Sequence, residues 1–315
     1  MAVPLNCTLA ACPIEWGYVH YQPSVPGNAF MLAAFGALIP PSIYLGWKYK
    51  THLFTGVFVI GLLAEVVGYV GRIMLHDNPF FKDYFLIYLI NLTLGPTVIA
   101  AAIYLTLARI VVVYGEEISR IRPRTYTLLF SGFDFLALIV QAAGGGMAAV
   151  AWIQADIDRG TYVLVAGLSI QVVSLLTFMG MSAEFAWRVR RRGASARHAD
   201  LRRTAKFQTF LGCLALATVL LFIRSVFRVV ELSEGFAGHL AQDQVSFMVL
   251  DGVMVLVAVI LLTVMHPGFA FGPAWTEAAF RWRVKKATSA PELELQMEAT
   301  KSNAIGHNTD ASHSA

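Results

Sequence analysis

Apolar residues gather in seven long runs that are separated by short polar or charged segments. Each run is close to the ~20 residues that a helix needs to cross the hydrocarbon core of a bilayer. The predicted spans are residues 28–47, 53–74, 85–108, 126–150, 161–183, 207–230 and 246–266. Pro40-Pro41 in the first span and Gly95-Pro96 in the third are expected to kink their helices. The pattern therefore predicts an all-α polytopic membrane protein.

The composition supports this assignment. Of 315 residues, 57% are hydrophobic and 14% are charged, and the mean hydropathy is +0.61. A soluble domain would have about a quarter of its residues charged. The three cysteines exclude a disulfide scaffold. We expect an external tail at 1–27, a seven-helix membrane domain at 28–268 and a cytoplasmic tail at 269–315, whose basic start precedes a polar stretch typical of disorder.

The charges of the loops indicate how the chain is oriented. Loops after the first, third and fifth spans are basic, with Lys48, Lys50, Arg120, Arg122, Arg124 and the run RVRRRGASARHADLRRTAK. The loops between them carry mostly acids. By the positive-inside rule, the N-terminus lies outside and the C-terminus in the cytoplasm. Asn6-Cys7-Thr8 is then either an external glycosylation sequon or a chance match.

Polar side chains occur inside the spans, where they are costly unless they face protein or water. The ionisable ones are Glu65, Arg72, Asp134, Glu184, Arg224, Arg228, Glu231 and Asp251, and Gln141 and Gln171 add uncharged polarity. One interpretation is a salt-bridge network that locks the helices together. For Arg72, Arg228 and Glu231, snorkelling to the outer interface is an equal alternative.

The functional interpretation is a polar cavity open toward the outer leaflet, which binds the headgroup of an amphiphile. Its candidate binding residues are Glu65, Gln141, Gln171, Arg224, Arg228, Glu231 and Asp251. Glu65 and Asp251 are the deepest acids of the outer half. They are therefore the candidates for contact with a cationic headgroup.

Helix geometry predicts an ion pair among these residues. Arg224 lies roughly 10 Å below the outer end of the sixth span, and Asp251 about 7–8 Å below that of the seventh, from the rise per residue. Similar depths on consecutive helices favour pairing, which spares both groups an unpaired buried charge. Arg224, Arg228 and Glu231 follow at i, i+4 and i+7, on one helix face.

Two smaller motifs each allow two interpretations. Gly144-Gly145-Gly146 in the fourth span suits close helix packing, and glycines that line a lipid path are the alternative. His266-Pro267-Gly268 ends the seventh span. His266 is expected to cap the last carbonyls of that helix rather than to act in catalysis.

Several blocks of the sequence together resemble a known family. They are YQPSVPGNAF, EVVGYVGRI, LGPTVIAAAIYLTLARI, QAAGGGM, GLSIQVV and FIRSVFRVVELSEGFAGHL, followed by LDG and HPG. This set is similar to the fungal lipid-translocating exporter family, seven-helix proteins that include sphingoid long-chain base exporters and aminocholesterol-resistance proteins. The chain departs from the family in its last external loop, AQDQVSFMVLD, where Asp243 or Gln244 replaces an acid followed by aromatics.

The resemblance implies a protein of the plasma membrane or an endomembrane that moves sphingoid bases, sterol-like drugs or porphyrins, and so confers efflux or resistance. No GxxxxGK[ST] motif is present, so ATP hydrolysis on this chain is not expected. The alternative is a seven-helix lipid-sensing receptor, although a DRY-like triplet and NPxxY are absent. A zinc hydrolase is disfavoured because the histidines lie on opposite sides of the membrane. We expect a non-enzymatic protein without cofactor, whose partners are lipids and not nucleic acid; its oligomeric state stays open.

Overall fold

The computed structural model describes most of the chain in one unit. The described residues are 12–14, 17–119, 122–151, 153–193, 198–235, 238–272 and 274–277. They belong to the unit Met1–Ala279, whereas the second unit, Phe280–Ala315, lies outside these ranges. The Asn6 sequon and nearly all of the C-terminal tail therefore fall outside the described residues. Cys12 is disulfide-bonded, and Cys213 is free.

Seven long helical segments form the framework. They are α1 (Val25–Lys48), α2 (His52–Asp77), α3 (Lys82–Tyr114), α4 (Pro123–Val150), α5 (Gln154–Arg192), α7 (Ala205–Ser233) and the continuous run of α8 (Gln244–Ser246), η4 (Phe247–Val253) and α9 (Met254–Val264). Each segment is long and apolar enough to cross a membrane, which confirms the seven predicted spans. Helix α1 continues through Pro40 and Pro41 and α3 through Pro96, so these prolines interrupt neither helix.

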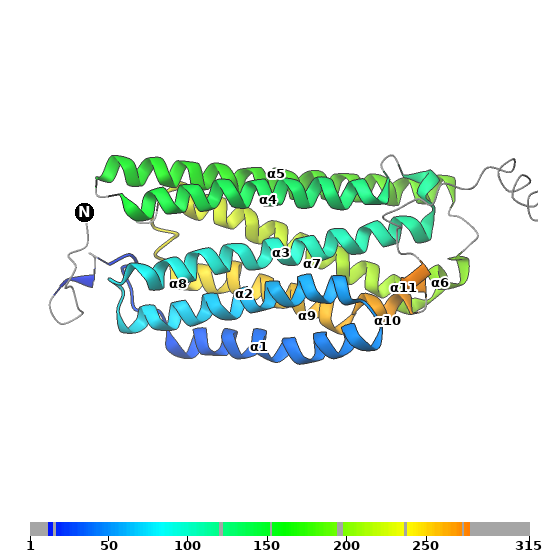
Figure 1. The fold of residues 1–315 in the computed structure, drawn as a ribbon, viewed down its shortest axis with the longest axis horizontal. Coiled ribbons are helices and arrows are strands. Elements are labelled where there is room, and N and C mark those ends of the chain that lie inside the picture. The colour runs from blue at the N-terminus through cyan, green and yellow to red at the C-terminus, as the bar shows by residue number, and fades with distance from the viewer. Residues whose placement is uncertain are drawn as a thin grey trace, which may run out of the picture. The chain divides into compact units, whose positions relative to one another are not determined.

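Short elements join or follow these helices. They are η2 (Glu116–Ile118), α6 (Ala199–Arg203), α10 (Pro267–Phe271) and α11 (Ala274–Glu277). Successive long helices run in opposite directions (Figure 1). The end of the bundle at which α1, α3 and α5 finish carries most of the basic loop residues, and we call it the basic end. The opposite end is the one at which α2, α4 and α7 finish.

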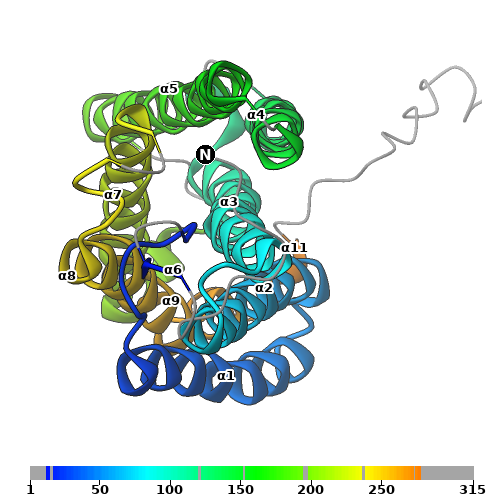
Figure 2. The same ribbon diagram turned by 90° about the vertical axis from the view of Figure 1, so that its left-hand side faces the viewer.

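The seven segments form a closed ring when the bundle is viewed along its axis (Figure 2). The helices that contact each other around the ring are α1–α2, α2–α3, α3–α4, α4–α5, α5–α7, α7–α9 and α9–α1. Helix α3 also contacts α7. In α3, 67% of the most apolar window is buried, against 22% in α1. Helix α3 is therefore the most buried of the seven segments, and α1 is the least buried.

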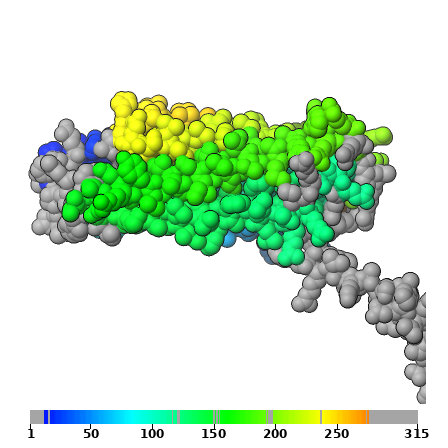
Figure 3. Space-filling view, turned by 90° about the horizontal axis from the view of Figure 1, so that it is seen from above, coloured from blue at the N-terminus to red at the C-terminus, as the bar shows by residue number. Residues whose placement is uncertain are grey.

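Large apolar side chains lie exposed on the outside of the bundle. Figure 3 shows the face that α4, α5 and α7 form. Phe135 on α4, Val173 and Leu176 on α5 and Ile223 on α7 are all exposed. Exposed apolar surface of this extent is unfavourable in water. It suits contact with lipid tails.

Glycines allow two helix pairs to pack closely. A Cβ atom at Gly68 of α2 would lie 2.4 Å from Leu92 of α3, and one at Gly144 of α4 would lie 2.3 Å from the backbone of Leu164 in α5. A side chain at either position would force these helices apart. The packing interpretation is thus confirmed for Gly144, whereas Gly146 faces open space.

Two polar residues at the ends of the last span act as helix caps. His266 does not cap the end of α9, contrary to the prediction; its Nδ1 accepts a hydrogen bond from the backbone N–H of Gly268 at 3.1 Å and so caps α10. At the opposite end, Asp243 accepts hydrogen bonds from the backbone of Val245 and from the Ser246 hydroxyl. The Ser246 bond lowers the pKa of Asp243 below its usual value. Asp243 is therefore committed to helix capping.

Candidate functional site

Arg224 and Asp251 form the predicted ion pair between α7 and η4. Their Nε and Oδ1 atoms lie 2.7 Å apart, and the side chains are 0% and 2% exposed. Arg224 Nη2 also donates a hydrogen bond of 2.5 Å to the backbone carbonyl of Leu92 in α3. One guanidinium therefore ties together three of the helical segments around the centre of the ring.

Arg228 and Glu231, one and two turns further along α7, are buried as well. Arg228 Nη1 lies 2.7 Å from Glu231 Oε2, and its Nε lies 3.8 Å from Asp251 Oδ1. The exposed fractions of Arg228 and Glu231 are 0% and 2%, and that of Arg72 is 1%. The snorkelling alternative is wrong for all three residues, because their charged groups are enclosed by protein.

Neutral groups surround Arg72. Its Nε donates to Asn28 Oδ1 at 3.1 Å, and its Nη2 donates to the Tyr21 hydroxyl at 2.8 Å. The guanidinium also lies 3.8 Å from the centre of the Phe247 ring, a cation–π contact that is favourable when water is excluded. Arg72 thus finds partners without a carboxylate.

Glu65 is a buried acid that no cation contacts directly among the described residues. It is 2% exposed and lies in the electrostatic neighbourhood of Asp251, Arg224 and Arg228. Within the described ranges it forms no ion pair, and its Oε1 has no hydrogen-bond partner. A Cβ atom at Gly95 of α3 would lie 2.5 Å from this oxygen, so glycine leaves the space that the carboxylate occupies.

We use the name charged cluster for Glu65, Arg224, Arg228, Glu231 and Asp251. The cluster contains three acids and two arginines, which leaves one acid in excess when all five are ionised. The Tyr69 hydroxyl, one turn from Glu65 on α2, is buried and also lacks a hydrogen-bond partner. Unpaired polar groups in a low-dielectric interior are costly. The cluster can therefore accept one more positive charge. That charge can be a proton, or a bound cation whose N–H or O–H groups donate hydrogen bonds to the unpaired oxygens.

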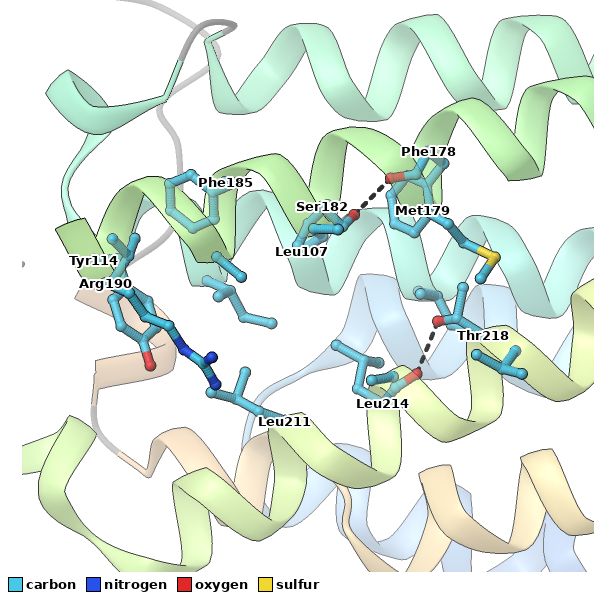
Figure 4. Close-up of a pocket in the computed structure, with 17 residues that line it drawn as sticks. Leu107, Tyr114, Phe178, Met179, Ser182, Phe185, Arg190, Leu211, Leu214 and Thr218 are labelled. Carbon is cyan, nitrogen blue, oxygen red and sulfur yellow. Dashed lines mark hydrogen bonds between the residues drawn. The ribbon is translucent and has the colours of Figure 1, made fainter. Parts of the chain in front are cut away.

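The sequence analysis predicted that these side chains line a cavity open toward the outer leaflet, and the structure does not show this. All five members of the charged cluster are at most 2% exposed, whereas residues that line a wet, open cavity would be accessible. The cluster is closed on itself in this conformation. A cavity of about 450 Å³ instead lies between α3, α5 and α7, toward the basic end (Figure 4).

Gln141 and Gln171 form a separate polar chain. Gln141 Nε2 donates to Gln171 Oε1 at 3.1 Å, and Gln171 Nε2 donates to Thr97 Oγ1 at 2.8 Å. These bonds connect α4, α5 and α3, and they do not reach a member of the charged cluster. The two glutamines therefore support helix packing, and the structure does not bring them together with the other predicted site residues.

A π-helical segment surrounds Asp251, and the sequence analysis missed it. Segment η4 runs from Phe247 to Val253 between two α-helical stretches. Short π segments are rare and occur often at functional sites. Gly252 contributes a second special feature, since a Cβ atom there would lie 2.6 Å from the Tyr69 hydroxyl. The LDG triplet was the available sequence signal, although glycine does not identify a π-helix.

The chain is similar in sequence to several known proteins. Residues 58–274 match the family model described as RTA1 like protein. The chain is 30% identical to the sphingoid long-chain base transporter RSB1 of Saccharomyces cerevisiae, over 81% of this chain and 74% of the relative. It is also 30% identical to protoporphyrin uptake protein 1 of that yeast, over 66% of each chain. Protein RTM1 is 30% identical over 75% of each. No solved structure matches the chain. The match over most of the membrane bundle shows that the chain belongs to the RTA1-like protein family.

Proposed function

We propose that this chain moves sphingoid long-chain bases, or amphiphiles with a similar amine, across the membrane. The observation that carries the proposal is the excess acid of the charged cluster, with Glu65 outside every ion pair that the described residues form. The name of the RSB1 relative supports the same class of substrate. Catalysis has no part in the proposal.

Glu65 is the proposed contact for the amine. A primary ammonium group has three N–H donors, and Glu65 Oε1 and the Tyr69 hydroxyl both lack partners on the same face of α2. Asp251 Oδ1 contacts Arg224 and has no hydrogen bond of its own. A bound ammonium would balance the excess negative charge and satisfy these oxygens. Arg224 and Arg228 would then hold the two other carboxylates, those of Asp251 and Glu231, in place.

Access to the cluster requires a change of conformation, because its side chains are enclosed. Segment η4 is the proposed moving part, since it carries Asp251 and its π-helical turn can convert to an α-helical one with a shift of the following residues. Such a shift would break the 2.7 Å contact between Arg224 and Asp251. Opening would thus expose acids to the amine while the alkyl tail of the substrate stays in lipid.

We further propose that the basic end faces the cytoplasm and that the protein resides in the plasma membrane. The basic residues at that end include Lys48, Lys50, Arg122, Arg124 and Arg203, which favours retention on the cytoplasmic side. Cys12 is disulfide-bonded, which suits an oxidising exterior. The tail at 1–27, with Asn6, is then external, and the tail at 269–315 is cytoplasmic.

The proposal is tested by flux measurements on purified protein in liposomes, with labelled sphingosine, a labelled sterol and a labelled porphyrin. We expect sphingosine movement above that of empty liposomes, and a decrease of about tenfold or more in Glu65→Gln, which keeps the size of the side chain and removes its charge. Glu184→Gln is the matched control, since Glu184 pairs with Arg188 near the basic end. Binding of sphingosine without flux would instead favour a lipid-sensing receptor.

A further inference from the structure

The cavity between α3, α5 and α7 has the dimensions of a ligand site. Its volume of about 450 Å³ lies within the range of roughly 300–1,000 Å³ that is typical of such sites. It does not include any member of the charged cluster. Residues that line it are Leu107, Tyr114, Phe178, Arg190, Leu214 and Thr218 (Figure 4).

The walls of the cavity are mostly apolar, and the hydroxyl groups in its middle are already hydrogen-bonded. Three lining residues carry hydroxyl groups: Tyr114 beside Arg190, and Ser182 and Thr218 further along. Ser182 donates its proton to the carbonyl of Phe178 at 2.7 Å, and Thr218 donates to that of Leu214 at 2.8 Å. These bonds, drawn as dashed lines in Figure 4, stay within each helix. The middle of the cavity therefore offers no free hydroxyl donor to a polar ligand and suits a hydrocarbon chain.

One end of the cavity is basic. The Arg190 side chain lies beside Tyr114 and Leu211 at that end (Figure 4). Within the described part of the chain, Arg190 is exposed and forms no ion pair, whereas its neighbour Arg188 is paired with Glu184 at 2.6 Å. The guanidinium of Arg202 lies 5.4 Å from the centre of the Tyr114 ring. One arginine therefore lines this end of the apolar cavity, and a second lies beside the Tyr114 ring.

The length of the cavity matches one leaflet of a bilayer. Along α5 its lining runs from Phe178 to Arg190, which is about 18 Å at the rise of an α-helix. Half of a hydrocarbon core is about 15 Å thick. The hydrocarbon tail of a lipid that enters from one leaflet can thus fill the cavity while the headgroup of the lipid stays at the level of Arg190.

We propose that this cavity binds an anionic glycerophospholipid, with one acyl chain between α5 and α7 and the phosphate against Arg190. Charge complementarity selects this occupant, since basic pockets between membrane helices bind anionic headgroups. The same arginines repel the amine of a sphingoid base. The site is therefore separate from the charged cluster and holds a lipid other than the proposed substrate.

The test measures lipid binding to the purified full-length protein by native mass spectrometry. Phosphatidylserine is compared with phosphatidylcholine that carries the same acyl chains. We expect wild type to bind phosphatidylserine about fivefold more tightly, and Arg190→Ala to lose this preference. Ala215→Phe, which places a ring in the cavity, should weaken the binding of both lipids at this site.

Two control variants and a separate readout keep the test decisive. Arg191→Ala removes a neighbouring arginine that stacks on Trp187 at 4.0 Å, and Leu216→Phe adds bulk outside the cavity; both should bind lipid as wild type does. Glu65→Gln should also keep the phosphatidylserine preference, even if it abolishes transport. Equal binding of the two lipids by wild type, or a dimer that Ala215→Phe dissolves, would overturn the proposal.

Discussion

Arg224 of α7 and Asp251 of η4 meet at 2.7 Å in the interior of the bundle, where neither side chain is more than 2% exposed. The contact joins the last two membrane segments, and the bond from Arg224 to the Leu92 carbonyl extends it to α3. It also occupies one of the three acids of the charged cluster. The pair therefore contributes both to the stability of the bundle and to the chemistry of the proposed site.

Removal of one partner of this pair should be strongly destabilising. We expect Arg224→Gln or Asp251→Asn alone to lower the free energy of unfolding by about 3–5 kcal/mol, because the remaining charge stays buried without its partner. The double variant should be less destabilised than the sum of the two single variants. Unfolding of the purified protein in mixed micelles measures this coupling. Strictly additive effects would show that the two charges do not depend on each other.

Gly252 and Tyr69 should be coupled in a similar way. A Cβ atom at Gly252 would lie 2.6 Å from the Tyr69 hydroxyl, so Gly252→Ala is expected to cost about 1–3 kcal/mol through overpacking. Tyr69→Phe removes the clashing oxygen. In that background the same alanine should be tolerated better, as measured by the melting temperature of the purified variants. An equal loss in both backgrounds would contradict the close approach of η4 to α2.

Substitutions in the glycine triplet should show which glycine packs against α5 and which faces open space. Gly144→Leu places atoms against the backbone of Leu164, whereas Gly146→Leu points into open space. We expect the first variant to be destabilised by several kcal/mol, because backbone cannot move aside as a side chain can. The second should melt within a few degrees of wild type. Similar melting temperatures for the two variants would refute the close contact of α4 with α5.

The orientation of the chain can be tested with the cysteines. In a Cys213→Ser background, we expect Cys12 in intact cells to react with a membrane-impermeant maleimide only after treatment with an impermeant reductant. This follows because Cys12 is disulfide-bonded and the proposed N-terminus is external. A mobility shift upon deglycosylation that is lost in Asn6→Gln would agree. Labelling that requires permeabilised cells would reverse the proposed orientation.

The sequence predicted the number and the depth of the helices but not their full lengths. The fifth span was expected at 161–183, whereas α5 runs from Gln154 to Arg192. Hydropathy marks only the residues in hydrocarbon, while helical hydrogen bonds continue into the polar interface. Depth also predicted the pairing of Arg224 with Asp251, because the rise per residue is fixed on both helices.

The sequence did not predict which polar residues would share a site. Gln171 lies at a depth near that of the acids, but its hydrogen bonds lead to Gln141 and Thr97. Arg72 follows Glu65 by two turns of α2 and is enclosed by Asn28, Tyr21 and Phe247. Depth and helix face leave open which neighbouring helix each side chain meets. For the same reason, the expected open cavity could not be distinguished from the closed cluster that is observed.

The most direct test of the central claim compares the binding of sphingosine with that of N-acetylsphingosine, whose nitrogen carries no charge, to wild type and Glu65→Gln by calorimetry. If the excess acid of the charged cluster recognises the amine, wild type should prefer sphingosine by about tenfold or more, equivalent to about 1.4 kcal/mol or more. The variant should bind both molecules with similar affinity. An undiminished preference for sphingosine in Glu65→Gln would contradict the account.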